Sequence, residues 1–303
     1  MCLHKLSTVD DTLEVLGTPK EYKRLRNWII RIITGWIIWS FFMNTFDSLW
    51  LNYEYFSITR MFVPFLGNHL LHINTLSALT WGTILRYTSS RFQKVNEHIR
   101  IIHSDLLKDN ADYTRKQNRF ILVNQGRTEV KKYKQYMWII MHVHLQLCLI
   151  SRELNKVFSV QMSLQMTSYF AFIVSVCREI YTTYINKNTK TILEQFLDSI
   201  FAYIWGIIYS VMILTLNHIC QIVYCKVNET VAILYKLSND NLDEDLREQT
   251  LQFILQIKQR KVKFGMGLFY FGYDFIRRFY KSIVTVLVII IQMHYTYEEP
   301  LPN

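Results

Sequence analysis

The sequence predicts an all-α integral membrane protein, and three observations lead to this prediction. Half of the 303 residues are hydrophobic, and only nine glycines and four prolines are present to interrupt helices. Basic residues gather in blocks that long apolar stretches separate. The stretches that contain no Asp, Glu, Lys or Arg are 32–46, 61–85, 135–151, 157–177, 199–225 and 282–297. Because a membrane-spanning helix needs about 20 mostly apolar residues, so many such segments argue against a soluble helical bundle.

About five transmembrane helices follow when the flanks of these stretches are included, at 27–50, 58–85, 157–180, 197–225 and 276–297. The basic blocks 1–31, 91–134 and 226–263 then fall on one side of the membrane, and the segment 51–57 and the acidic end of the chain on the other. Because Lys and Arg accumulate on the cytoplasmic side, we expect a cytoplasmic N-terminus and an extracellular C-terminus. This placement explains the net charge of +10 without nucleic acid as a partner.

Residues 135–151 leave a second topology open. They are apolar enough to span the membrane, and counting them would invert the orientation of everything downstream. The loop to the next span would then be only Arg152 to Lys156. The composition of that loop and the charge bias favour a cytoplasmic helix that continues into the span 157–180.

A cytoplasmic helical anchor is predicted from 86–156 together with 226–275. In the first segment, Phe92, Val95 and Ile99 recur at a spacing of three or four residues, which one face of a helix requires. We expect two helical extensions of the flanking spans there.

The junction between those two extensions is expected near Asp109–Asn118. In the second segment, the helix of the fourth span is expected to continue through Leu237. A polar turn at Ser238–Glu244 and a further helix over Leu246–Tyr270 are expected to follow. Such a bundle is apolar on one side and offers a surface on which a homo-oligomer can assemble.

Histidines are the candidates for metal or haem ligands, at His69, His72, His142 and His144. A metal site needs several convergent donors, and no acidic residue accompanies the first pair within its span. Ordinary hydrogen bonding within a helical bundle is the favoured interpretation. The sequence also lacks a phosphate-binding glycine loop and the common hydrolase motifs, so we expect no cofactor, no metal and no enzymatic activity.

The outer halves of the predicted spans are rich in aromatic residues, which suit the wall of a pocket for a small organic molecule. An interfacial aromatic belt or helix packing is the alternative for any one of them. The candidate pocket residues are Phe42, Phe46, Phe65, Tyr169, Phe172, Tyr203 and Trp205.

The last predicted helix carries a polar stripe. Thr285, Ile289 and Gln292 are spaced i, i+4 and i+7, so they share one helix face. An amide in an otherwise aliphatic span is costly unless it faces protein or water. This helix therefore either lines a pore with that face or packs it within a bundle.

The C-terminal stretch resembles the insect gustatory receptor family. The last span of that family carries Thr-Tyr, five hydrophobic residues and Gln-Phe, and here Thr285 and Gln292 match at that spacing. Val286 and Met293 replace the two aromatic residues. Three further segments resemble the family: Ser90–Asn96, Leu147–Cys148 with Leu154–Ser159, and Phe264–Phe269. The family has seven spans, and this chain resembles the last five, so we expect it to lack the first two.

The resemblance implies a tastant-gated cation channel of four subunits, a homotetramer or a heterotetramer with other receptor subunits. Helices 27–85 and 157–225 would bind a small-molecule tastant, and 86–156 with 226–275 would hold the subunits together. The last helix, 276–297, would surround a central pore, with Gln292 lining it and Ile289 in a hydrophobic gate. The resemblance further implies a place in the plasma membrane of chemosensory neurons.

Three other functions remain open at this point. A chain that lacks two helices of the ligand-binding bundle could be a non-conducting truncated receptor that acts as an accessory subunit. An odorant receptor is a close neighbour of the gustatory family. A multi-pass membrane enzyme that holds haem or a metal through its histidines is the third alternative.

Overall fold

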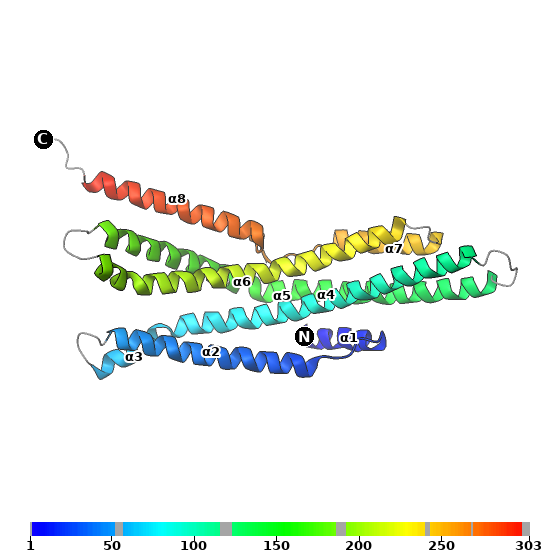
Figure 1. Ribbon diagram of the computed structural model, residues 1–303, viewed down its shortest axis with the longest axis horizontal. Coiled ribbons are helices and arrows are strands. Elements are labelled where there is room, and N and C mark those ends of the chain that lie inside the picture. The colour runs from blue at the N-terminus through cyan, green and yellow to red at the C-terminus, as the bar shows by residue number, and fades with distance from the viewer. Residues whose placement is uncertain are drawn as a thin grey trace. The chain divides into compact units, whose positions relative to one another are not determined.

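The computed structural model describes residues 2–51, 57–115, 123–185, 192–239, 243–267 and 269–298. Within those ranges every element is an α-helix except for one short β-hairpin (Figure 1). The elements are α1 (Cys2–Val15), α2 (Tyr22–Leu51), α3 (Ile58–Gly67), α4 (His69–Arg115), α5 (Val123–Ile185), α6 (Ile192–Asn239), α7 (Glu244–Gln259), β1 (Gly265–Met266), β2 (Phe269–Tyr270) and α8 (Tyr273–Glu298). The all-α fold class is thereby confirmed. Most of the segment 51–57 and the chain after Glu298 lie outside the described residues.

Three of the described helices are long and apolar enough to cross a membrane: Tyr22–Leu49, Lys131–Thr182 and Ala202–Asn239. The second of these helices includes the whole expected span 157–180, and the first and third include most of the expected spans 27–50 and 197–225. The expected spans 58–85 and 276–297 are not among them.

The expected helix 58–85 is two helices, so this part of the prediction is wrong. α3 ends at Gly67, and α4 begins after Asn68. Pro64 lies inside α3 and has no N–H to give to the helix, and glycine is a weak helix former. The side-chain amide of Asn68 donates to Asp47 Oδ2 on α2 at 2.8 Å, which ties the junction to that helix.

Residues 135–151 belong to α5, which runs unbroken over 63 residues. At 1.5 Å per residue this helix is about 95 Å long, whereas the hydrocarbon core of a bilayer is about 30 Å thick. A helix that does not reverse crosses the bilayer only once. The structure therefore confirms that 135–151 continue into 157–180, and it excludes two separate spans there.

The described helices group into two compact units. Unit 1 comprises Met1–Ser151 and Lys226–Lys261, and unit 2 comprises Arg152–Cys225 and Val262–Asn303. The division falls inside α5 and α6, which therefore contribute to both units.

The core of unit 1 contains the helix face that the sequence predicted. Phe92, Val95 and Ile99 on α4 are fully buried, and so are Leu234 and Leu237 near the end of α6. α6 thus continues to Asn239, as expected, and the polar turn that was expected after it overlaps residues 240–242, which are outside the described part of the chain. α4 continues to Arg115, and the rest of the junction expected near Asp109–Asn118 is outside that part too.

The helix expected over Leu246–Tyr270 is wrong beyond its first part. α7 ends at Gln259, and the chain then forms the antiparallel hairpin of β1 and β2. Gly265 has a φ of +131° and Gly272 a φ of +139°, which are backbone conformations that other residues rarely adopt and that a right-handed helix does not contain.

A buried ion pair fixes α1 to α4 in unit 1. Arg91 Nε lies 2.7 Å from Asp10 Oδ1, and the two side chains are 3% and 2% exposed. The hydroxyl of Tyr87 donates to the other carboxylate oxygen of Asp10 and accepts from the Arg91 guanidinium. Both charges are therefore compensated without water.

The same ion pair bears on how the chain crosses the membrane. Asp10 precedes α2 and Arg91 follows the charge-free stretch 61–85, yet their side chains touch. If α2, which is long and apolar enough to cross a membrane, does so, then the chain has to cross back before it reaches Arg91.

We expect Asp10→Asn to lower the free energy of unfolding by about 3–5 kcal/mol, because it leaves the buried Arg91 charge without its partner. Chemical unfolding of the purified full chain in detergent measures this cost. Asp11→Asn is the matched control, because Asp11 is 60% exposed and pairs with Lys20 at the surface; it should cost less than about 1 kcal/mol. Equal costs for the two variants would contradict the structural role of the buried pair.

Candidate functional site

The three predicted residues of α8 lie together on its uncovered face. Thr285 and Gln292 are exposed, and Ile289 is 49% exposed. On the opposite side of the helix, Phe279 and Ile283 are buried at 7% and 4% exposure. The structure thus brings the polar stripe together as its spacing predicted, on the side that unit 2 does not cover.

The covered face of α8 packs through aromatic rings. Phe279 meets Phe170 of α5 edge to face, with 5.6 Å between ring centroids. Phe271, Phe275 and Phe279 continue this contact along the base of the helix at centroid distances of 5.5 and 5.7 Å. Aromatic pairs of this kind contribute beyond their buried area, so the base of α8 is well fixed within unit 2.

Side chains of α5 and α6 hold the hairpin that precedes α8. Asn155 donates from Nδ2 to the Gly265 carbonyl at 3.1 Å, and its Oδ1 accepts from the Gly265 N–H at 2.7 Å. On α6, the Tyr224 hydroxyl accepts from the Phe264 N–H at 2.8 Å, and Asn217 Oδ1 accepts from the Gly272 N–H at 2.8 Å. The backbone that leaves helical geometry is therefore hydrogen-bonded by two neighbouring helices.

Gly265 has no room for a side chain at this point. A Cβ there would lie 2.1 Å from the carbonyl oxygen of Phe269 on the paired strand. Asn155 and Gly265 come from two of the segments that carried the family resemblance, and the structure places them in direct contact.

Sequence reasoning missed Asn217, Gln221 and Tyr224. All three bond the backbone between α7 and α8, since the N–H of Tyr273, the first residue of α8, also donates to Gln221 Oε1 at 3.5 Å. They stand at i, i+4 and i+7 in the charge-free stretch 199–225. The same spacing singled out the stripe on α8, so it was the signal that would have found them.

The seven candidate pocket residues fall into two separate groups. In unit 1, Phe42 stacks on Phe46 with centroids 6.3 Å apart. Phe65, also in unit 1, contacts Phe41 at 6.3 Å.

In unit 2, three of the candidates surround Tyr209, a residue that sequence reasoning missed although it lies one turn after Trp205. Tyr169, Phe172 and Trp205 approach its ring at 5.4, 5.0 and 5.7 Å. Tyr169 is buried and Phe172 is 48% exposed, so the cluster reaches from the core to the surface of unit 2. Tyr203 lies on the same helix and is half-buried.

The four candidate histidines have ordinary surroundings. His72 Nε2 donates to Asn44 Oδ1 at 3.1 Å, and His142 stacks on Trp138 at 5.9 Å. His144 is fully buried between Phe92 and Phe253, while His69 is exposed. In the part of the chain that the structure describes, no three His, Cys, Asp or Glu residues gather as metal ligands would.

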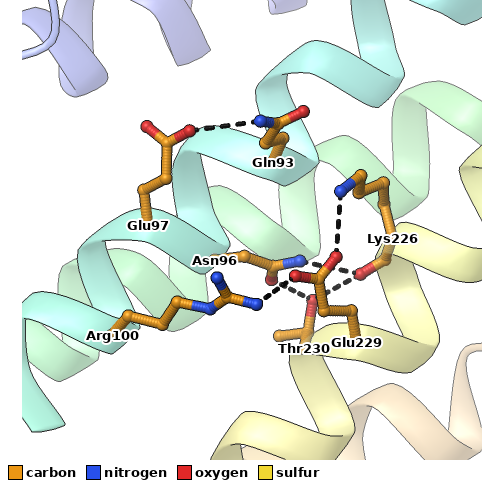
Figure 2. A network of polar contacts seen from close by, with 7 residues as sticks. All are labelled: Gln93, Asn96, Glu97, Arg100, Lys226, Glu229 and Thr230. Atoms are coloured by element: carbon orange, nitrogen blue, oxygen red, sulfur yellow. Dashed lines mark hydrogen bonds and ion pairs between the residues drawn. The ribbon is translucent and has the colours of Figure 1, made fainter.

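A polar network joins α4 to the end of α6 in unit 1, as Figure 2 shows. Asn96 Nδ2 donates to the Lys226 carbonyl at 3.0 Å, and the Thr230 hydroxyl donates to Asn96 Oδ1 at 2.6 Å. Glu229 bridges Arg100 and Lys226 beside them. Because Asn96 and Thr230 are buried and satisfy each other, this contact fixes the axial register of the two helices.

A second buried polar group in unit 1 is His98. Its Nε2 lies 2.8 Å from the Thr18 hydroxyl and its Nδ1 2.9 Å from the Tyr136 hydroxyl. A neutral imidazole has one donor and one acceptor nitrogen, so it satisfies both hydroxyls. Burial lowers the pKa of His98 below its usual value, because the charged ring would lose hydration.

Comparisons with known proteins give one result. A family whose description is "7tm Chemosensory receptor" matches residues 2–297 of the chain. The matched region includes Asn155, Asn217 and Tyr224 with the hairpin that they bond, the network between α4 and α6, and the stripe on α8. No curated protein matches the chain.

We expect Gly265→Ala to lower the free energy of unfolding by at least about 2 kcal/mol, because the methyl group collides with backbone and the φ is unfavourable. Gly35→Ala on α2 is the control, because nothing lies within 4 Å of the added Cβ. It should leave stability unchanged or raise it by up to about 1 kcal/mol. Denaturant unfolding measures the free energy of unfolding of both variants. If Gly265→Ala left that free energy unchanged, the hairpin would not be held as described.

We expect stability to fall as the pH drops below about 6.5, the unfolded value for histidine. The unfolded chain binds a proton at His98 there while the folded chain does not, so acid favours unfolding. The fully buried His144 acts in the same direction, because burial lowers its pKa to about 3. His98→Gln should therefore reduce, without abolishing, the dependence of melting temperature on pH between 7.5 and 5.5, and His4→Gln, at an exposed position, should not. A slope that His98→Gln leaves unchanged would refute the role of His98.

Proposed function

The chain belongs to the 7tm chemosensory receptor family, and from this premise we propose that it is a gustatory chemoreceptor, a subunit of a tastant-gated cation channel. The family is one of membrane receptors and not of enzymes. We place the subunit in the plasma membrane of chemosensory neurons, with a cytoplasmic N-terminus and an extracellular C-terminus. Four subunits, identical or mixed with other receptor subunits, would surround one pore.

The observation that supports the channel best is the uncovered face of α8. Gln292 stands there with Thr285 and Ile289, and an amide side chain is costly in lipid. A water-filled pore between four α8 helices removes that cost. Ile289, one turn away, supplies the aliphatic constriction that closes a pore by excluding water.

Coupling between ligand and pore runs through unit 2 in this proposal. The aromatic cluster around Tyr209 lies on α5 and α6, and the same two helices hold the hairpin through Asn155 and Asn217. α8 begins directly after the residue that Asn217 holds. A tastant that prefers one arrangement of α5 and α6 therefore shifts the base of α8, and it opens the pore by differential affinity.

The remaining parts have supporting roles. The helices of 27–85 and 157–225 form the ligand-binding part, and 276–297 form the pore. The segments 86–156 and 226–275 form the cytoplasmic anchor. The network of Asn96 and Thr230 supports this last role, because it fixes α4 to α6 within the anchor.

The second candidate is a non-conducting accessory subunit. This alternative needs neither a pore nor a tastant site in the chain itself; among the described residues, three helices are long and apolar enough to cross a membrane. Such a subunit would bind full-length receptors and alter their response without conducting on its own.

Whole-cell current from cells that express the chain alone, under a broad tastant panel, tests the proposal. A ligand-evoked cation current supports the channel, and surface-labelled protein that stays silent favours the accessory subunit. In the conducting case we expect Gln292→Arg to abolish cation current or invert the selectivity, because it places positive charge in the pore.

Gln292→Glu is the matched variant, since it has similar size and the opposite charge. It should preserve or strengthen cation selectivity. If currents through both variants have the selectivity of the wild type while surface labelling is equal, Gln292 does not line the pore.

A further inference from the structure

A polar cavity of about 760 Å³ lies in unit 1 between the start of α2 and the middle of α4. The residues that line it carry an excess of positive charge. Its basic side chains are Arg24 and Arg31 from α2 and Arg86, Arg91 and Lys94 from α4, against one acidic residue, Glu21.

The cavity lies where the apolar parts of two antiparallel helices end. On α2 the charge-free stretch begins after Arg31, and on α4 the charge-free stretch ends before Arg86. The guanidinium of Arg86 lies 4.8 Å over the ring of Trp28, which brings the two ends to the same level. Tryptophan and arginine together at such a boundary are typical of the membrane–water interface.

Two of the five cations have no acidic partner among the described residues. Arg91 pairs with Asp10, Lys94 with Glu97 and Arg24 with Glu21. Within the same part of the chain, no carboxylate lies in ion-pair distance of Arg31 or Arg86.

The cavity also offers neutral hydrogen-bonding groups, from Asn27, Ser90 and Gln93. Guanidinium groups and neutral donors together suit phosphate oxygens, which accept several hydrogen bonds at once. Outside the cavity, α2 exposes Ile30, Ile33 and Ile37, which are 54%, 42% and 54% exposed. These side chains offer an apolar surface to an acyl chain.

We propose that this cavity binds the polyphosphorylated headgroup of a membrane lipid of the phosphoinositide class, with the acyl chains against α2. The proposal goes beyond the chemoreceptor function, because it uses none of the aromatic residues of the candidate pocket and none of the three residues assigned to the pore. It relies on the proposed orientation only in that this end of α2 faces the cytoplasmic leaflet. A headgroup there links α2 to α4 at the base of the ligand-binding helices.

The test is a binding titration of the purified full chain in detergent with a fluorescent phosphatidylinositol bisphosphate at fixed ionic strength. Arg31→Gln/Arg86→Gln should weaken binding about 25-fold, since each basic residue near such a headgroup contributes about fivefold. Arg31→Lys/Arg86→Lys keeps both charges and should retain most of the affinity. Melting curves show whether each variant is folded.

Lys131→Gln/Lys132→Gln is the matched control, because it removes two exposed charges from α5 of the same unit. It should change the affinity less than twofold. The proposal is overturned if this control loses as much affinity as the cavity variant, or if phosphatidylserine binds as tightly as the phosphoinositide. Soluble inositol trisphosphate that binds as tightly as the lipid would replace the lipid by a free phosphate ligand. Because no current is measured, failure here is distinguishable from failure of the channel proposal.

Discussion

Backbone N–H and C=O groups must be hydrogen-bonded wherever water is excluded. This requirement explains both the long helices of the chain and the way in which the non-helical connection before α8 is held. Long helices meet it internally, and α4, α5 and α6 each run far beyond the thickness of a bilayer. The connection from α7 to α8 leaves helical geometry and meets the requirement differently. There, side chains of Asn155, Asn217 and Tyr224 bond the backbone of Phe264, Gly265 and Gly272. The orientation of α8 is thus decided by polar groups on other helices.

Charge is arranged under the same constraint. The buried Asp10 and Arg91 are paired with each other, and the half-buried Glu229 is paired with Arg100 and Lys226. The cavity between α2 and α4 departs from this pattern, because it collects cations at the boundary of the apolar stretches. A departure of this kind costs stability in the empty protein, and a bound anion offsets that cost.

The sequence predicts those features that depend only on residues close to one another along the chain. The burial of Phe92, Val95 and Ile99, and the common face of Thr285, Ile289 and Gln292, follow from helical periodicity alone. The helix expected over Leu246–Tyr270 was wrong because a glycine's φ is set by its partners, here Asn155 and Asn217, far away in the sequence. The break at Asn68 and the central place of Tyr209 also depend on neighbouring helices. The ion pair between Asp10 and Arg91 could not be predicted either, because no pattern in the residues around Asp10 indicates it.

That last contact has a consequence for how the protein is made. Arg91 leaves the ribosome about eighty residues after Asp10, which at 5–20 residues per second is a delay of several seconds. If α2 spans the membrane, α1 can dock on α4 only after the chain has returned through α3 and the start of α4. If α2 crossed the membrane and the chain did not return through α3 and α4, Asp10 and Arg91 would be left on opposite sides of the bilayer. Docking of α1 is thus a late step, which is complete only when Arg91 has reached the side on which Asp10 lies.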